Sequence, residues 1–571
     1  MHYQALATDY DGTLATDGRV DEAVLAALRA VRASGRRLIL ISGREHDDLL
    51  RVFPCLHVFD RVVLENGGLL IRPADGDAVP LGEPPPPSFV ESLRRRGVSP
   101  LSTGHVIVSS WEPNEKAVLE SIREMGLEYQ VIFNKGAVMV LPPGINKASG
   151  LRAALKDLQL SPHNVVGIGD AENDQSFLQI CGCSVAVANA LPSIKEASDM
   201  VTAGARASGV REIASRLIEN DLADAPLSAS RHRVVLDADS EEGEVILPAR
   251  GSSVLVAGSS GSGKSTLIQA LLEKLVEHEY QYCVIDPEGD YEHLPGTLVA
   301  GSREHAPDVA QVVEHLEEPD VNLAVNLLAI SLAERPAFFT ELLSALLRLR
   351  VRRGRPHWTV VDEAHHMLPA DDVSTGIAQP FGGMIFVTVH PDQLSATASS
   401  AIDLVIAVGA AARETIEMFC RQIGRPAPPL PEEPLTPDEA LTWSASTGGN
   451  PSRIAALKPR GERRRHIRKY AEGQLGEDKS FYFRGPDDRL NLRAHNLGLF
   501  MQMADGVDDA TWLHHLRAGD YSRWLRDSIK DLELAAEAER AEAQPEADPS
   551  STRERIRAAI ERRYTGPASS R

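Results

Sequence analysis

Two aspartates separated by one residue are the first groups in this chain that could do chemistry. Asp9 and Asp11 lie in the segment Asp9-Tyr10-Asp11-Gly12-Thr13, directly after an apolar run that predicts a buried strand. In open α/β sheets, ligands bind beyond the carboxyl ends of the strands. One carboxylate at such a turn can attack a phosphorus atom while its neighbour handles the proton, and Gly12 permits close approach to an anion. The alternative interpretation is an acidic surface turn.

Three later segments carry polar side chains that suit the same chemistry. The Ser42 hydroxyl, in Ile41-Ser42-Gly43-Arg44, ends the second predicted strand and can hold a phosphoryl oxygen. Lys147 can neutralise a transferring phosphoryl group. Asp170 and Asp174 follow the apolar run Val165–Ile168, and their carboxylates suit Mg²⁺, which takes oxygen ligands. Together these segments favour phosphoryl transfer over the surface turn.

A glycine-rich loop indicates a second reaction centre. It follows the apolar run Val254–Ala257 and precedes a helical pattern over Leu267–Leu275. In this context it is a P-loop, in which backbone amides wrap phosphates, Lys264 reaches the β and γ phosphates, and the Ser265 hydroxyl ligates Mg²⁺. The residues of this loop that are predicted to bind the nucleotide are Gly258, Gly261, Ser262, Gly263, Lys264, Ser265 and Thr266.

Two further acids complete the second centre. Asp362 and Glu363 end the apolar run Trp358–Val361, in the pattern of a Walker B strand. We expect Asp362 to hold Mg²⁺ through water and Glu363 to orient the attacking water. The alternative is a buried strand with an acidic surface turn, which the P-loop upstream disfavours.

The elements that must position these residues form two βα series. Alternating strand and helix patterns over 1–220 predict a parallel sheet with helices on both faces, interrupted by a smaller inserted unit over 84–143 that follows a run of prolines. A second series spans 231–430. A small helical module is expected over 475–532, and 533–571 reads as a charged tail, either a solvated helix or disorder. The predicted fold class is therefore multidomain α/β.

The first set of motifs resembles the haloacid dehalogenase superfamily, specifically its Cof-like, C2-capped phosphatases. The resemblance covers about 1–219 and includes Glu65-Asn66-Gly67-Gly68, a turn that this subgroup carries before its cap. It implies a Rossmann-like phosphatase core with a small α+β cap that sets specificity. The implied substrate is a small phosphorylated metabolite, such as a sugar phosphate or phosphoglycolate. The alternative is a decayed phosphatase that serves as a scaffold.

The same resemblance implies a role for each polar side chain. Asp9 would be the nucleophile that forms an aspartyl-phosphate, and Asp11 would be the general acid and then the base. Ser42 and Lys147 would stabilise the phosphoryl group. The implied Mg²⁺ ligands are Asp9, Asp170 and the backbone carbonyl of Asp11, with Asp174 in support.

The second set of motifs resembles the HerA/FtsK branch of P-loop ATPases, most closely the HerA-like group. The resemblance covers roughly 231–425 and rests on the P-loop, on Asp286-Pro287-Glu288-Gly289-Asp290-Tyr291 and on Asp362-Glu363-Ala364-His365-His366. It implies a RecA-like domain that binds and hydrolyses ATP. It also implies a homo-oligomer, with a hexameric ring as the family's usual form, and DNA as the usual cargo.

Several positions depart from that family or are open in meaning. Val389 occupies the place of the family's sensor glutamine, and His390 or Gln393 could take over its task. Arg421 and Arg425 are candidate arginine fingers, or else ordinary surface arginines. The module over 475–532 carries no chemistry that we can assign, so a structural or interaction role is expected there.

Composition limits the remaining function classes. The formal net charge is −21, which disfavours nonspecific DNA binding, although the basic runs Arg348–Arg353 and Arg460–Arg468 leave local contacts with DNA open. No run of about 18 apolar residues predicts a membrane span. Five scattered cysteines indicate no disulfide framework. We therefore expect a cytoplasmic protein with no membrane partner.

Three functions remain open for the whole chain. The first is a Mg²⁺-dependent phosphomonoesterase whose activity is gated by ATP in the fused ring-type domain. The second is a DNA-dependent ATPase with an accessory phosphatase that acts on nucleotides or nucleic-acid ends. The third is a regulatory assembly in which nucleotide binding controls oligomer or partner formation.

Overall fold

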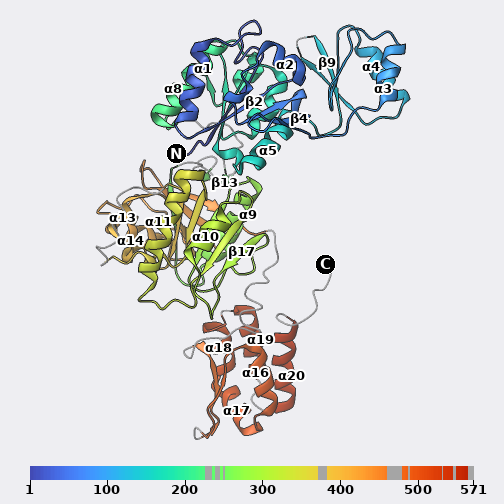
Figure 1. Ribbon diagram of the computed structural model, residues 1–571. Helices are drawn as coiled ribbons and strands as arrows, with labels where there is room; N and C mark the ends of the chain where they lie inside the picture. Colours follow the sequence, from blue (N-terminus) through green and yellow to red (C-terminus); the bar gives the residue numbers. More distant parts are fainter. Residues whose placement is uncertain are drawn as a thin grey trace. The chain divides into compact units, whose positions relative to one another are not determined.

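The computed structural model describes most of the chain (Figure 1). The chain divides into two compact units, Met1–Leu457 and Lys458–Arg571. The described residues are 1–134, 136–225, 234–237, 245–247, 251–370, 382–436, 438–459, 479–486, 489–529, 531–543 and 548–562.

An α/β domain with a mainly parallel sheet forms the N-terminal part of the first unit. Its strands are β1 (Ala5–Asp9), β2 (Arg37–Ile41), β3 (Arg61–Leu64), β4 (Leu69–Arg72), β5 (Asp77–Pro80), β10 (Val165–Gly169), β11 (Cys183–Ala186) and β12 (Met200–Val201). Their order is β12-β11-β10-β1-β2-β3-β4-β5, and only the β3–β4 and β4–β5 pairs are antiparallel. The central position of β1 places its carboxyl end between those of β10 and β2.

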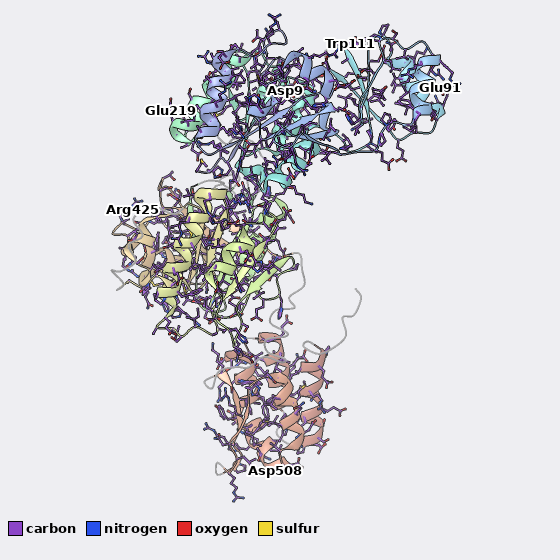
Figure 2. The ribbon with its side chains drawn as sticks, viewed as in Figure 1. Asp9, Glu91, Trp111, Glu219, Arg425 and Asp508 are labelled. Atoms are coloured by element: carbon purple, nitrogen blue, oxygen red, sulfur yellow. The ribbon has the colours of Figure 1, made fainter. Side chains whose placement is uncertain are left out.

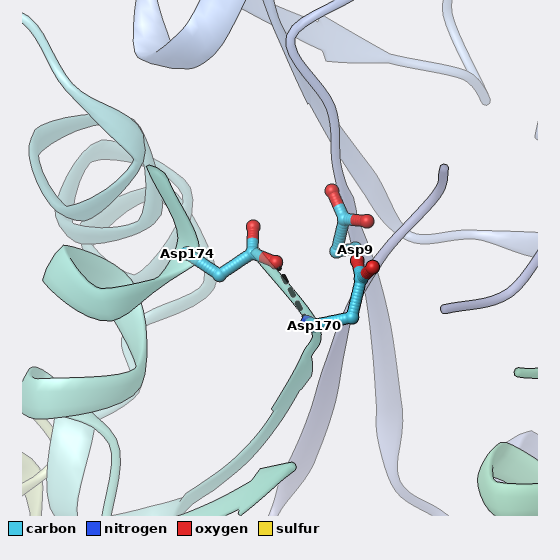
Figure 3. Close-up of side chains that lie close together, drawn as sticks. All are labelled: Asp9, Asp170 and Asp174. Atoms are coloured by element: carbon cyan, nitrogen blue, oxygen red, sulfur yellow. Dashed lines mark hydrogen bonds between the residues drawn. The ribbon is translucent and has the colours of Figure 1, made fainter. Parts of the chain in front are cut away.

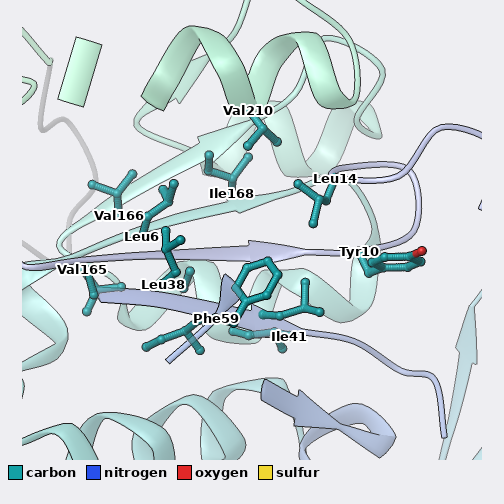
Figure 4. Packing of buried hydrophobic residues seen from close by; sticks show 14 of the residues in the cluster. Leu6, Tyr10, Leu14, Leu38, Ile41, Phe59, Val165, Val166, Ile168 and Val210 are labelled. Carbon is teal, nitrogen blue, oxygen red and sulfur yellow. The ribbon is translucent and has the colours of Figure 1, made fainter. Parts of the chain in front are cut away.

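The strands of this sheet are apolar along most of their length because helices cover both faces. The helical elements are α1 (Glu22–Ala33), α2 (His46–Val52), η1 (Leu56–Val58), η2 (Glu65–Gly67), α5 (Lys147–Leu158), η3 (Pro162–Asn164), η4 (Glu172–Asp174), α6 (Gln175–Ile180), α7 (Pro192–Ala197) and α8 (Ala207–Asn220). Val210 of α8 packs with Ile168 and Leu6 in one buried core (Figure 4). Burial of this kind contributes about 1.5–3 kcal/mol for each large side chain.

An inserted cap follows β5. It consists of α3 (Pro87–Arg95), β6 (Ser102–Thr103), β7 (Val108–Trp111), α4 (Glu115–Glu124), β8 (Gln130–Asn134) and β9 (Ala137–Leu141), with the antiparallel strand order β6-β7-β9-β8. Side chains of α3 and α4 share a core with Val108, Val138 and Val140, so the two helices cover one face of the cap sheet (Figure 1). These elements lie inside the range 84–143 predicted for the cap.

A second α/β domain contains the glycine-rich loop. Its strands are β15 (Ser253–Ala257), β16 (Tyr282–Asp286), β17 (Thr297–Ala300), β18 (Asn322–Asn326), β19 (Trp358–Val361), β20 (Met384–Thr388), β21 (Ile402–Val408), β22 (Glu439–Ser444) and β23 (Ser452–Ala455). Their order is β17-β18-β16-β19-β20-β15-β21-β22-β23, with β22 and β23 antiparallel to their neighbours. β17, β18, β22 and β23 were not expected from the sequence. A separate hairpin pairs β13 (Val234–Asp237) with β14 (Val245–Leu247).

Helices complete this second domain. They are α9 (Lys264–Glu277), α10 (Val309–Leu316), α11 (Arg335–Arg353), α12 (Ala364–Met367), η6 (Pro391–Gln393), α13 (Ala396–Ser400) and α14 (Ala412–Gln422). The buried hydrophobic residues of these strands belong to two clusters. One cluster also contains residues of α11 and α14, and the other also contains residues of α9. The sheet is therefore covered on both faces, as the nearly continuous apolar strands require.

Within the first unit, the two α/β domains contact each other at the amino ends of their strands. The ring of His163, in η3 before β10, stacks on Tyr280 with a centroid separation of 3.8 Å, and its Nε2 lies 2.6 Å from the carbonyl oxygen of His278. Asn164 Nδ2 donates to the carbonyl oxygens of His2 and Gly354. The contact therefore lies at the start of β10 and beside the start of β16.

A buried arginine reinforces this contact. Arg355, between α11 and β19, has no solvent exposure. Its guanidinium donates to Gln281 Oε1 and to the carbonyl oxygens of Glu317 and Gln159. One of these acceptors, Gln159, belongs to the N-terminal domain, so a single side chain ties both domains together.

The second compact unit is mainly helical. It contains β24 (Phe481–Phe483), β25 (Leu492–Ala494), α16 (Leu497–Gly506), α17 (Asp509–Ala518), α18 (Asp520–Asp527), α19 (Leu532–Glu542) and α20 (Pro549–Ile560). Trp512, Leu534 and Ile556 lie in one core. The expectation of a charged tail over 533–571 was wrong for α19 and α20, because their small and aliphatic residues recur at helical spacing and bury one face.

No helix in the described residues is long and apolar enough to cross a membrane.

Candidate active sites

A buried ion-pair cluster lies at the carboxyl ends of β1 and β10. Lys147, the first residue of α5, has a side chain that is 2% exposed. Its Nζ donates to Asp9 Oδ1 at 2.6 Å and also bonds to Asp174. The helix can begin at Lys147 because Asn146 caps it by accepting from two backbone amides. The structure thus brings together three residues that are far apart in the sequence.

Three carboxylates of this cluster could hold a divalent cation. Asp9, Asp170 and Asp174 each offer an oxygen, and these atoms lie within 4.8 Å of one another (Figure 3). Asp174 Oδ2 already accepts from the backbone amides of Asp170 and Ala171, and Oδ1 accepts from Lys147. Asp174 therefore fits a supporting position, and Asp9 and Asp170 are the candidate direct ligands. Oxygen donors of this type fit Mg²⁺.

The electrostatics of the cluster agree with that fit. Burial raises the pKa of the Asp9 carboxyl to about 8, Asp174 adds to the rise and Lys147 opposes it. Burial alone would lower the pKa of Lys147, but the carboxylates of Asp174 and Asp9 raise it above its ordinary value. The lysine is charged, and the surplus of buried negative charge is what a bound cation would offset.

Asp11 lies outside this cluster. Its side chain is 43% exposed and makes a two-point ion pair with Arg44, at 2.7 Å to Nε and 2.8 Å to Nη2. Arg44 also contacts Asp48 of α2. The sequence interpretation missed this role of Arg44, although the residue stands beside Ser42 in the quoted motif. The guanidinium fixes the direction of the Asp11 carboxylate.

Ser42 and its neighbours form the loop facing the cluster. Ser42 is buried, its hydroxyl accepts from the Arg44 amide, and its carbonyl oxygen accepts from the Asn66 amide. Asn66 has a positive φ of 54° and bonds through Oδ1 to Asn173 Nδ2. Thr13, which the sequence interpretation did not single out, donates to Asp170 Oδ1 at 3.1 Å. These bonds hold the loops after four strands, β1, β2, β3 and β10, in one arrangement.

The second centre lies at the carboxyl end of β15. Lys264 begins α9, and its Nζ donates to the carbonyl oxygens of Gly258 and Ser259. A Cβ at Gly258 would lie 2.3 Å from the Val408 carbonyl oxygen, so the loop needs glycine there. Ser262 Oγ is buried and has no hydrogen-bond partner. Gly261, Gly263, Ser265 and Thr266 occupy the same loop and the first turn of α9.

The Ser262 hydroxyl and the start of α9 indicate whether a phosphate fits the glycine-rich loop. An unpartnered buried hydroxyl costs about 1–3 kcal/mol unless a ligand satisfies it. The N-terminus of α9 adds amide donors and a partial positive charge. The donors of this loop therefore match the phosphates of a nucleotide.

Asp362 and Glu363 lie beside that loop, at the end of β19. Asp362 Oδ1 accepts from the Glu363 amide. Burial is the largest cause that raises the pKa of Asp362 to about 7, and the adjacent Glu363 contributes to this rise. Glu363 has a φ of 44°, a strained backbone state for this residue type and one typical of functional sites. Asp286, at the end of β16, adds a buried carboxylate that accepts from the amides of Asp290 and Tyr291.

The strand β20 lies between β19 and β15, so its carboxyl end is next to both motifs. Val389 directly follows it. His390 is exposed, and its amide donates to Thr388 Oγ1. The same oxygen lies 3.0 Å from His365 Nδ1, and that nitrogen is 3.5 Å from Glu363 Oε2. Gln393 lies in η6, where its amide bonds to His390.

The candidate arginine fingers and the two basic runs have different surroundings in the structure. Arg425 donates to the Ala445 carbonyl oxygen within its own domain, whereas Arg421 is exposed on α14. In the first basic run, Arg350 is partly buried and donates to backbone carbonyls, including those of Pro356 and Gly382. The second run, Arg460–Arg468, lies outside the described residues.

Two family models match the chain. One, described as haloacid dehalogenase-like hydrolase, matches residues 6–79 and 111–213, and the other, described as the central domain of helicase HerA, matches 249–346. The gap in the first match covers α3 and β6 of the cap.

Relatives resemble the N-terminal part. A phosphoglycolate phosphatase of Methanothermobacter thermautotrophicus is 29% identical over 225 residues, which is 38% of this chain and 99% of the relative. Another, of Halorubrum lacusprofundi, is 32% identical over 223 residues, which is 37% and 96%. A solved haloacid dehalogenase-like hydrolase of Bacteroides thetaiotaomicron shares 20% identity over 38% of this chain and 99% of its own, with a TM-score of 0.34, too low to bear on function.

Proposed function

Because the chain belongs to the haloacid dehalogenase-like hydrolases and also carries a HerA-type central domain, we propose that it is a Mg²⁺-dependent phosphomonoesterase fused to an ATP-hydrolysing domain. The observation that carries the first half is the buried Lys147–Asp9–Asp174 cluster at the carboxyl end of the sheet. Burying three charges is costly, and a scaffold has no need of them. The substrate is a small phosphorylated metabolite, and the phosphoglycolate phosphatase names of the relatives make phosphoglycolate the first ester to test.

The chain's own residues supply the steps of ester hydrolysis. An Asp9 carboxylate oxygen attacks phosphorus, and the bond from phosphorus to the leaving oxygen breaks while Asp11 gives that oxygen a proton. Asp11 then takes a proton from water, which attacks the aspartyl-phosphate and releases inorganic phosphate. Lys147 and the Ser42 hydroxyl offset charge on the phosphoryl oxygens. Asp9 and Asp170, with the Asp11 carbonyl, would hold Mg²⁺, which supplies further charge neutralisation when bound.

In the second domain, the P-loop amides and Lys264 bind the nucleotide phosphates. Ser265 and Asp362 would hold the accompanying Mg²⁺, and Glu363 orients the attacking water. The support is the strained backbone of Glu363 together with the buried, unpartnered Ser262 hydroxyl of the loop.

The contact between the two domains supports coupling of the two activities. It joins the starts of β10, β16 and β19, whose opposite ends lead into Asp170, Asp286 and Asp362. A nucleotide-dependent shift of β16 or β19 would reach the first centre along β10. We propose this route for gating of the phosphatase by ATP.

The match to the HerA central domain favours a second candidate, a DNA-dependent ATPase with an accessory phosphatase. It requires ATP turnover that rises with added DNA and an assembly, such as a hexameric ring, that surrounds the strand.

The test follows the organic product released from a panel of phosphomonoesters, with and without ATP. Asp9→Asn should abolish product formation and leave ATP hydrolysis intact, whereas Lys264→Ala should abolish ATP hydrolysis and any ATP effect on the phosphatase. Asp17→Asn, at an exposed carboxylate, is the matched control. Product formation that survives Asp9→Asn would refute the proposed nucleophile, and ATP turnover stimulated by DNA would favour the second candidate.

A further inference from the structure

The cap sheet has one face that no cap helix covers. Along β7 and β9, Val108, Val138 and Val140 point toward α3 and α4. Since side chains alternate along a strand, Ser109, Trp111, Ala137 and Met139 point to the opposite face. The register supports this grouping, because Ser109 pairs with Met139 and Trp111 pairs with Ala137.

That face lies against the loops of the phosphatase centre. Ser109 Oγ donates to Glu45 Oε1 at 2.9 Å, and Ser102 Oγ donates to Glu45 Oε2 at 2.7 Å. Glu45 directly follows Arg44, which holds Asp11. Met139 Sδ lies 3.6 Å from the position of a Cβ on Gly43. The contacts bring the cap face over the loop that carries Ser42 and next to the general acid.

Trp111 lies on this face, two residues beyond Ser109, so roughly 7 Å further along the strand. The residue is 53% exposed, and its ring lies over Gly136, 3.7 Å from the position of a Cβ there. Figure 2 shows Trp111 on the side of the cap toward the core, with Glu91 of α3 on the far side. A large exposed indole on the cap face that meets the phosphatase loops through Ser109 and Met139 is a surface on which a flat ligand could stack.

We propose that Trp111 is a specificity-determining residue of the phosphatase, and that its indole stacks on the ring of a substrate whose leaving alcohol is a sugar. This inference rests on the proposed phosphatase function. A flat aromatic face suits the apolar face of a sugar ring. Phosphoglycolate has no ring, so it offers no face on which the indole could stack.

The test compares kinetics on a hexose 6-phosphate and on phosphoglycolate. Trp111→Ala should raise KM for the hexose phosphate about five- to tenfold, the range for one aromatic contact, with kcat nearly unchanged and phosphoglycolate unaffected. Trp111→Phe should restore most of the loss. The matched control is Phe133→Ala, because Phe133 is an exposed aromatic residue on the helix-covered face of the same sheet.

Direct binding separates failure of this inference from failure of the proposed function. Calorimetry on Asp9→Asn with Mg²⁺ measures the affinity for hexose 6-phosphate with no need for turnover. Binding that weakens when Trp111→Ala is added supports the inference even if the wild type releases no product, a result that would count only against the phosphatase function. No binding of the hexose phosphate, equal effects on both esters, or a loss of the same size in Phe133→Ala would overturn the inference.

Discussion

At the scale of single residues, the phosphatase centre depends on the buried ammonium group of Lys147. Lys147 bonds to Asp9 and Asp174, each nearly free of solvent exposure. Removing this ammonium group would leave the carboxylates of Asp9 and Asp174 buried without its positive charge. Buried ion pairs are strongly destabilised by the loss of one partner for this reason.

Lys147→Met should lower kcat by about 10²–10³-fold, the range for removing one preorganised charge from a transition state. It should also lower the free energy of unfolding by about 3–5 kcal/mol. Steady-state kinetics and urea unfolding measure the two effects. Lys156→Met, at an exposed position of the same helix, should change neither. Wild-type kinetics in Lys147→Met would show that the lysine is structural only.

The strained residue of the second centre, Glu363, gives a second prediction at this scale. Glu363→Gln keeps the size and the hydrogen-bonding atoms of the side chain but removes its charge. ATP turnover should fall by about 10²-fold, within the usual range for a water-orienting base, while nucleotide affinity changes little. Nucleotide affinity and ATP turnover are measured on the same variant. Glu414→Gln, on the surface of α14, is the control and should change neither quantity. A loss of nucleotide affinity as large as the loss of turnover would contradict the role assigned to Glu363.

At the scale of elements, a buried carboxylate of the core, that of Glu65, holds the backbone of the cap segment. Glu65, in η2 after β3, has no solvent exposure. Its Oε1 accepts from the amide of His105, and its Oε2 accepts from the amides of Val106 and Ile107. A Cβ at Gly104 would lie 2.6 Å from this carboxylate, so the cap segment approaches as closely as only glycine allows.

Glu65→Ala should therefore destabilise the cap attachment. Three amides lose a charged acceptor, which is worth about 1.5–3 kcal/mol for each hydrogen bond before water compensates. We expect a loss of about 3 kcal/mol in urea unfolding and faster proteolysis within 84–143. Glu83→Ala, on the exposed approach to α3, should match the wild type. Unchanged protease sensitivity in Glu65→Ala would exclude this role.

The contact between the two α/β domains predicts a dependence on pH. Burial lowers the pKa of His357 well below 6.5, and His163 adds to the effect. Above pH 6.5 both folded and unfolded states carry a neutral His357. As the pH falls below 6.5, His357 binds a proton in the unfolded state but stays neutral in the folded state. The free energy of unfolding of the first unit should therefore fall by up to about 1.4 kcal/mol per pH unit.

His357→Asn should flatten this slope between pH 6.5 and 5. Asparagine can still accept the hydrogen bond that the Gln281 amide donates to His357 Nδ1. Urea midpoints measured across that range check the prediction. His293→Asn, at an exposed position, should retain the wild-type slope, and an equally steep slope in His357→Asn would rule out this histidine as the cause.

At the scale of the whole molecule, the chain comprises two units with separate cores. Residues of the first unit form the two sheets and both candidate centres, whereas Phe481, Trp512 and Ile560 share a different core. Neither centre draws a described side chain from the second unit.

A chain ending at Leu457 should therefore fold and keep both activities per molecule. Phosphate release from the best ester and ATP hydrolysis should lie within about twofold of the full chain, since no described catalytic group is lost. Size measurement with and without ATP would then show whether assembly depends on 458–571. Loss of either activity in the shortened chain would show that the second unit contributes to the centre concerned.

The sequence by itself predicted the chemistry of both centres. Asp9, Lys147 and the P-loop could be identified because phosphoryl transfer needs fixed residue types at the carboxyl ends of strands, and those strands are visible as apolar runs. The ranges matched by the two family models include Asp9, Lys147 and the P-loop. The same local patterning hid α19, because its short alanine-rich pattern resembles a solvated helix until a partner covers it.

Only the tertiary structure decided how distant segments meet. The Arg44–Asp11 ion pair, the Glu65 contact with the cap and the Arg355 link between domains join residues from separate elements. The exposed face that carries Trp111 also depends on strand register, which no local pattern fixes. Local sequence patterns indicate which residues form strands, helices and turns. These contacts instead arise from the packing of segments that lie far apart in the sequence, at separations that no motif fixes.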